Sequence, residues 1–258
     1  MLSFLLELVP SLLVGFWLGG QQPELSTRLA RPLVRFGVPL SVMGLLLRGG
    51  LTSAVLKAAV VAPVVVSLWL VLVSIQSAGN PHRSSALRLG SCVGNTAYVG
   101  VPLALAFLPE TALPITIGYD IGATLFTWSV GAVMLAGGSL QSSSLLRGAA
   151  QGLLLSPASR GLLGALLVQW TPWNESLADA LWWPSRLVLI LALFVVGLRL
   201  GALFRDRRIP GLLNPGLRAA LVGKLLLFPL LLTVLGLLLR WDPLMIKAMA
   251  CLLYTSPS

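Results

Sequence analysis

The sequence predicts an all-α, polytopic membrane protein, because its composition and the length of its apolar runs both indicate helices in a bilayer. Hydrophobic residues make up 57% of the chain and charged residues 10%, against about 45–50% and about 25% in soluble domains. The mean hydropathy is +0.92. At roughly 20 residues per membrane span, the 258 residues allow about nine or ten helices and no separate soluble domain.

Residues 1–137 are expected to hold the first five helices. A connection with three arginines leads into the second helix, which Pro39 is expected to bend. Apolar runs place the first, third and fifth helices at residues 2–19, 56–75 and 113–136, and the three arginines are Arg28, Arg31 and Arg35.

The fourth helix is expected to be broken within the string GNTAYVGVP, residues 94–102. Its proline removes a backbone donor and clashes with the preceding turn, and its glycines cost helix stability. An unpaired N–H or C=O group in hydrocarbon is costly, so irregular backbone at that depth is tolerated only inside protein or beside a water-filled cavity. The string therefore predicts a cavity that faces the positive end of a half-helix beginning near Val101. The candidate binding residues are Gly94, Asn95, Thr96, Tyr98, Gly100 and Pro102.

The fifth helix carries one acid, Asp120, in the string YDIGATLFTW. A carboxylate many residues from either end of an apolar span is costly, and such residues usually face a cavity or a partner. Two roles stay open for Asp120: a carrier of a proton or coupling ion, and a structural hydrogen-bond partner.

The longer string GNTAYVGVPLALAF, residues 94–107, resembles the glycine, asparagine and proline signature in the fourth helix of the auxin efflux carrier family, bacterial type. The order of the other helices is similar to that family over nearly the whole chain. The resemblance implies two inverted five-helix repeats with crossed, broken helices. It also implies a secondary transporter that moves a small organic anion such as a carboxylate, and nothing in the sequence selects among auxin-like and dicarboxylate anions.

The second repeat is expected at residues 161–250, after a cytoplasmic linker at 138–160. Lys224 in KLLLFP echoes Lys57 in KAAVVAP, at the place where an inverted repeat would put it. Both lysines are expected to reach a membrane interface. The sixth, seventh and eighth helices are placed at residues 161–170, 187–200 and 219–239, with the start of a ninth at 244.

The chain is expected to be a carrier truncated within its second broken helix, with about nine of ten helices present. In the first half, Asn95 follows Lys57 by 38 residues and Pro102 follows Pro63 by 39. The same distances from Lys224 and Pro229 place the second asparagine-like and proline positions near 262 and 268, beyond Ser258. The tail CLLYTSPS, residues 251–258, resembles adapter read-through and is expected to be non-native. On this interpretation the fragment itself does not transport.

Loop charges predict the orientation in the plasma (inner) membrane. Connections after odd-numbered helices hold 12 Lys and Arg residues and those after even-numbered helices hold five, so the N-terminus is placed outside. The net charge of +10 would suggest nucleic acid in a soluble protein, but here it marks cytoplasmic loops, and no nucleic acid partner is expected.

An enzyme is not expected, because the chain lacks HExxH, GxSxG and paired intramembrane aspartates, and its one histidine, His82, falls in a polar loop. The absence of a Walker A motif argues against direct use of ATP. Two alternatives remain: an ion-coupled symporter or antiporter of the related bile-acid or sodium–proton exchanger type, and a structural membrane protein whose glycines and prolines only pack helices. The expected partners are the organic anion and the lipid bilayer. No cofactor or metal is expected, and a homodimer stays open.

Overall fold

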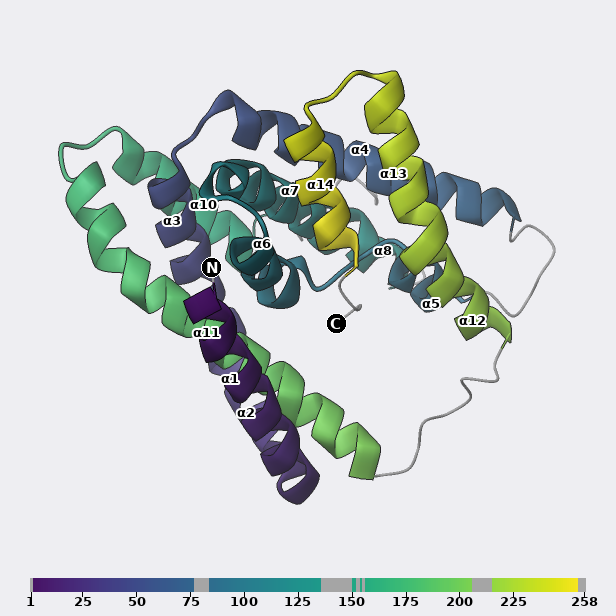
Figure 1. Cartoon of the computed structure of the whole chain (residues 1–258), viewed down its shortest axis with the longest axis horizontal. Coiled ribbons are helices and arrows are strands. Elements are labelled where there is room, and N and C mark those ends of the chain that lie inside the picture. Colours follow the sequence, from purple (N-terminus) through teal and green to yellow (C-terminus); the bar gives the residue numbers. More distant parts are fainter. Residues whose placement is uncertain are drawn as a thin grey trace.

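The regular secondary structure in the part of the chain that the structure describes is entirely helical (Figure 1). The structure is a computed structural model, and it describes residues 2–76, 84–135, 150–151, 154, 156–205 and 215–254. Most of the predicted linker at 138–160, the last four residues of the predicted tail at 251–258, and His82 lie outside these ranges.

The chain begins with α1, and a second, continuous helical span follows it from Pro23 to Gly49. The first group of elements is α1 (Leu2–Gln21), α2 (Pro23–Pro32), η1 (Leu33–Gly37), α3 (Val38–Gly49), α4 (Ser53–Gln76), α5 (Ser85–Gly90), η2 (Thr96–Gly100), α6 (Val101–Phe107) and η3 (Glu110–Ala112). The remaining elements are α7 (Leu113–Phe126), η4 (Thr127–Gly131), α8 (Ala132–Leu135), α10 (Pro157–Gln169), α11 (Asn174–Arg205), α12 (Pro215–Val222), η5 (Gly223–Leu227), α13 (Phe228–Leu238) and α14 (Pro243–Leu253). Of the η elements, η3 is a 3₁₀ turn and the others are π-helical turns.

Four helices of the described residues are long and apolar enough to cross a bilayer, which makes this a membrane protein. They are Pro23–Gly49, Ser53–Gln76, Asn174–Arg205 and Pro215–Leu238. The shorter apolar helices Thr96–Phe107 and Pro243–Leu253 are consistent with half-spans.

The arginine-bearing segment after α1 is helical, so the prediction of a loop there is wrong. Pro23 at the start of α2 fixes a helical backbone angle without losing a needed hydrogen bond. Glu24 then accepts a hydrogen bond at 3.0 Å from Arg28, one turn further on. Propensity and local pairing thus extend the helix through a polar stretch that hydropathy alone leaves out.

Three of the four π-helical turns come directly before a proline. In each, the residue that precedes the proline donates its N–H to the carbonyl five residues back instead of four. This wider turn moves the backbone away from the pyrrolidine ring, which would otherwise clash with the carbonyl four residues before it. The prolines therefore bulge their helices without ending them. The pairs are Val38 to Leu33, Val101 to Thr96, and Phe228 to Gly223.

One group of helices is built on α11. The Ser11 hydroxyl donates to the Ile190 carbonyl at 2.8 Å, and Arg186 donates to Glu7 at 2.9 Å. Near the other end of the same pair, Arg205 donates to the carbonyl of Gly20. Because the residue numbers rise together along both helices, α1 and α11 run parallel, as Figure 1 shows for the purple and green helices.

The same group includes α3 and α10. Ser185 of α11 lies against α3, where its hydroxyl donates to the Leu40 carbonyl at 3.5 Å, and Arg48 at the end of α3 pairs with Asp179 at 2.8 Å. Along these contacts the residue numbers fall in α11 as they rise in α3, so these two helices are antiparallel. We call α1, α2, η1, α3, α10 and α11 the first helix group.

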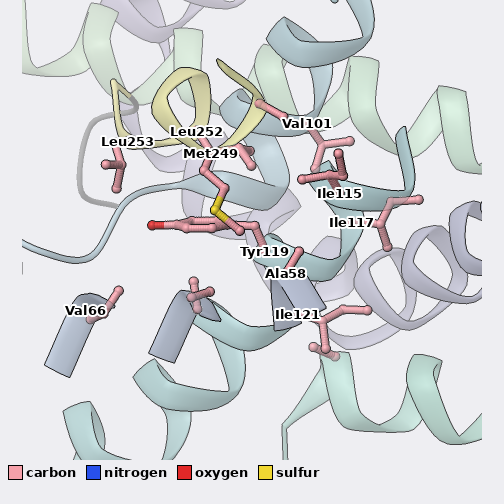
Figure 2. Close-up of a cluster of buried hydrophobic side chains, with 14 of the residues drawn as sticks. Ala58, Val66, Val101, Ile115, Ile117, Tyr119, Ile121, Met249, Leu252 and Leu253 are labelled. Atoms are coloured by element: carbon pink, nitrogen blue, oxygen red, sulfur yellow. The ribbon is translucent and has the colours of Figure 1, made fainter. Parts of the chain in front are cut away.

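The second helix group consists of α4, α5, η2, α6, η3, α7, η4, α8, α12, η5, α13 and α14, with the segment 91–95 that joins α5 to η2. Its core lies between α4, α7 and α14, where Tyr119 and Met249 are almost completely buried. Figure 2 shows this cluster of side chains, with Leu252 of α14 and Ala58 of α4 beside them. The second group therefore has a hydrophobic core of its own, and it meets the first group along η2, α6 and α7.

Candidate functional site

The predicted broken helix is present, and its break covers the residues between α5 and η2. Helix α5 ends at Gly90, and helical structure resumes at Thr96. Asn95 caps the new helix, because its side-chain oxygen accepts a hydrogen bond from the Tyr98 N–H at 3.3 Å. The half-helix thus begins at Thr96, whereas the sequence predicted a start near Val101, more than a turn later. The η2 bulge absorbs Pro102, so the proline does not set the break.

The carbonyls that the break frees are taken up by side chains from other helices. The Trp69 indole N–H of α4 donates to the Ser91 carbonyl at 3.1 Å. The Lys224 ammonium of η5 donates to the Val93 carbonyl. This satisfies two groups that would be costly to leave unpaired at this depth.

The predicted interface location of Lys224 is wrong, while Lys57 on α4, the lysine with which the sequence analysis compared it, is exposed. Lys224 is only 2% exposed. The physical reason is the break itself, because its free carbonyl provides an acceptor for the ammonium inside the protein. Sequence reasoning missed Lys224 as part of the site, and the Lys-to-Pro echo between the halves was the one signal that singled it out.

A cavity of about 190 Å³ adjoins the break and lies between the two helix groups. One wall consists of the break and the face of α7 that carries Asp120. The other wall is apolar and belongs to the first group. The lining residues from the second group are Val93, Gly94, Asn95, Thr96, Ala97, Tyr98, Asp120, Ala123, Thr124, Thr127 and Trp128, and those from the first group are Val34, Val38, Val42, Pro157 and Ala158.

Most of the sequence-predicted site residues meet at this cavity. Gly94, Asn95, Thr96, Tyr98 and Asp120 line it. Gly100 and Pro102 do not: both are buried on the helix that follows the break. Their contribution is to the shape of η2 and α6.

Asp120 is held by a hydroxyl from the broken helix. It is 5% exposed, and the Thr96 hydroxyl donates directly to its carboxylate. The Thr124 hydroxyl, one turn further along α7, is a second hydrogen-bond partner of the same carboxylate. Both threonines line the cavity, so the carboxylate lies at the cavity wall with its hydrogen bonds supplied by neutral groups.

Sequence reasoning missed Thr124 of α7 and Thr127 and Trp128 of η4, which line the cavity with Asp120. Thr124 and Thr127 follow Asp120 by four and seven residues in YDIGATLFTW, a spacing that places all three on one face of a helix. That periodicity was the available signal. The apolar wall from the first group carried no comparable signal, because its residues are ordinary in a membrane helix.

The arrangement favours an anionic guest with hydrogen-bond acceptors. The first N–H groups of a helix have no partner within it, and the helix dipole makes that end positive. Here that end is Thr96 and Ala97, both on the cavity wall beside the Asn95 amide. Among the described residues, the buried Tyr98 hydroxyl has no hydrogen-bond partner.

No three His, Cys, Asp or Glu side chains come together as metal ligands within the described ranges. A scan of protein-family models, a search of curated proteins and a search of solved structures each found no match to this chain. The chain's own residues and geometry are therefore the evidence for its function.

Proposed function

We propose that this protein is a secondary transporter that moves a small organic anion, such as a carboxylate, through the cavity between its two helix groups. The observation that carries the proposal is the broken helix, whose N-terminal donors and Asn95 amide open onto that cavity. Discontinuous helices with half-helix N-termini aimed at a binding site are characteristic of secondary transporters.

The cavity dimensions support a small guest. Pockets for drug-sized ligands hold about 300–1,000 Å³, and this cavity holds about 190 Å³. Its polar wall offers donors at Asn95 and Thr96, and its opposite wall is apolar. A short carboxylate, with a charged head and a small apolar body, matches both walls.

Asp120 is proposed as the coupling residue. It lies at the same cavity as the N-terminal donors, a hydroxyl donates to it, and none of the ion pairs among the described residues involves it. A carboxylate without a cationic partner can take up a proton, and the protonated form repels an incoming anion less than the ionised form. Proton uptake at Asp120 would then favour anion binding at Asn95, which gives a route to coupled transport.

The finer fold proposal is that the chain is built from inverted repeats, residues 1–137 and 161–250. Two helix pairs of the first group support it. Helix α1 runs parallel to α11, and α3 runs parallel to α10, because Gly161 packs on Pro39 and Gly164 on Met43. A two-fold axis in the membrane plane that exchanges α1 with α10 and α3 with α11 would convert one pair into the other.

The proposed location is the plasma (inner) membrane with the N-terminus outside, on the loop-charge bias. The parallel pairing of α1 and α11 supports an odd number of membrane crossings between them, as five-helix repeats require. The alternative of an ion-coupled exchanger draws support from the buried Asp120, and the same assay separates the two.

The test is uptake by proteoliposomes that contain the protein expressed from its natural reading frame. Labelled acetate, malate, benzoate and indole-3-acetate are offered, with and without a proton gradient, and labelled sodium in parallel. Uptake of at least one anion above empty liposomes is the expected result. Sodium flux without anion flux would support the exchanger, and no flux of any solute would support the structural protein.

A further inference from the structure

We propose that Lys224 is a positioning residue for the anion site: its ammonium replaces the helical donor that Val93 has lost, and this keeps the Ala97 N–H free to face the cavity. The functional meaning of this inference rests on the proposed anion site. The inference itself comes from one buried cation and the break it contacts.

Two carbonyls of the broken helix receive hydrogen bonds from side chains and not from the helix itself. In an uninterrupted helix the Ala97 N–H would donate to the Val93 carbonyl, four residues back. In the structure the Lys224 ammonium donates to that carbonyl instead. The same exchange occurs two residues earlier, where the Trp69 indole replaces the Asn95 N–H as donor to the Ser91 carbonyl. Two side chains thus supply the donors that backbone N–H groups would supply in an unbroken helix.

In the part of the chain that the structure describes, Lys224 has no acid partner that would explain its burial. None of the ion pairs among the described residues involves it, and its one hydrogen bond there goes to the Val93 carbonyl. An intramembrane ammonium is costly. A lysine in this place is explained by the carbonyl it satisfies, two residues before Asn95.

The segment that carries Lys224 is itself fixed against the same helix that carries the second donor. Phe228 stacks on Trp69 with ring centroids 5.3 Å apart and an interplanar angle of 16°. Gly223 packs so closely that a Cβ there would lie 3.1 Å from the Trp69 ring. The two donors therefore form one unit that spans α4 and η5 and holds the break, and neither of them lines the cavity.

Cys92 provides a direct readout, because it lies between the two satisfied carbonyls and is only 2% exposed. The experiment uses the full chain in membrane vesicles with Cys251→Ser, so that Cys92 is the single thiol. The rate of alkylation by N-ethylmaleimide is measured for the parent, Lys224→Met, Lys224→Arg and Lys57→Met. Methionine keeps the length of the side chain and removes the donor, whereas arginine keeps the donor and the charge.

We expect Lys224→Met to raise the alkylation rate about tenfold or more, because an orphaned buried carbonyl, which costs about 1–3 kcal/mol, draws water into the break. Lys224→Arg should restore a rate close to the parent, and the exposed Lys57→Met should leave it unchanged. The alkylation rate is measured without a substrate. A failure of this proposal can therefore be distinguished from a failure of the proposed transport function, which uptake tests.

Parental reactivity in a folded Lys224→Met, or an equal rise in Lys57→Met or Lys224→Arg, would overturn the proposal. Should Lys224→Met not reach the membrane, Trp69→Phe serves as the second variant. It removes the indole N–H donor together with the part of the ring that packs on Gly223 and keeps an aromatic ring beside Phe228, and a severalfold rise in Cys92 alkylation is expected. An unchanged rate in Trp69→Phe would contradict the account.

Discussion

Thr96 joins the two parts of the polar wall of the cavity, the break and α7, through one hydrogen bond from its hydroxyl on η2 to Asp120 on α7. The bond does two things: it orients the start of the half-helix, and it satisfies a buried carboxylate. Hydrogen bonds to charged groups contribute about 1.5–3 kcal/mol, more than neutral ones. We therefore regard this pair as the strongest single link between the break and its neighbour.

Thr96→Val should lower the free energy of unfolding by about 1–3 kcal/mol, because the buried carboxylate loses a donor. Thr116→Val is the matched control. Thr116 is equally buried on α7, but its hydroxyl donates to the Ala112 carbonyl of the preceding turn, so its loss should cost less than about 1 kcal/mol. Detergent-based denaturation of the two variants checks this, and equal destabilisation would contradict it.

Asp120→Asn should flatten the pH dependence of anion uptake. Asparagine keeps a hydrogen-bonding group beside Thr96 but cannot gain or lose a proton, so a coupling step at this residue would disappear. Uptake is measured from pH 5 to pH 8 in the parent and the variant. A pH profile that survives the substitution would reduce Asp120 to a structural partner of Thr96.

At the scale of helices, close packing through glycine fixes α7 against α4. A Cβ at Gly118 would lie 2.9 Å from the Val55 Cα and 3.0 Å from the Ala58 Cβ, and one at Gly122 would lie 3.0 Å from the Pro63 Cδ. Small residues at such contacts let membrane helices approach closely. This packing carries Asp120, which lies between the two glycines, to the cavity wall.

Gly118→Ala should destabilise the protein by about 1–3 kcal/mol, because the methyl group meets backbone atoms that cannot move aside. Gly90→Ala on α5 is the control: nothing lies within 4 Å of its added Cβ, and alanine favours a helix by up to about 1 kcal/mol over glycine. Thermal unfolding in detergent should separate the two variants. Comparable losses of stability in both would show that the α4 contact is not decisive.

The broken helix shows what local sequence could and could not predict. Glycine, asparagine and proline together predicted a break next to a cavity, and the break is there. Its position was predicted a turn too late, because proline was expected to end a helix and a π-helical turn accommodates it instead. The partners of the freed carbonyls, Trp69 and Lys224, come from remote segments, and spacing within one helix carries no information about them.

At the scale of the whole molecule, hydropathy predicted a helical membrane protein, and four of the described helices are long and apolar enough to cross a bilayer, but it misjudged the lengths of helices. Helix α11 runs from Asn174 to Arg205, well beyond the predicted 187–200. Its polar first turns are held by long-range pairs, Arg48 with Asp179 and Arg186 with Glu7. Such pairs depend on the tertiary arrangement, so a hydropathy window cannot detect them.

The parallel arrangement of α1 and α11 yields a topology prediction. Gln22 follows α1 and should face the cytoplasm, whereas Asn174 begins α11 and should face outward. Single-cysteine variants Gln22→Cys and Asn174→Cys, in a background without Cys92 and Cys251, are treated with a membrane-impermeant maleimide on intact cells. Labelling of Asn174→Cys alone is expected. Labelling of Gln22→Cys alone would reverse the orientation, and labelling of both would contradict the parallel spans.

The most direct test of the central claim, that the break forms an anion site, is uptake by Asn95→Ala of an anion that the parent transports. Asn95 caps the half-helix and lines the cavity, and loss of the cap costs only about 0.5–2 kcal/mol of stability. The account predicts normal membrane insertion and a drop in uptake of at least about tenfold, the effect of about 1.4 kcal/mol of lost binding. Asn174→Ala, away from the cavity, should transport like the parent. Parental uptake by a correctly inserted Asn95→Ala would contradict the claim.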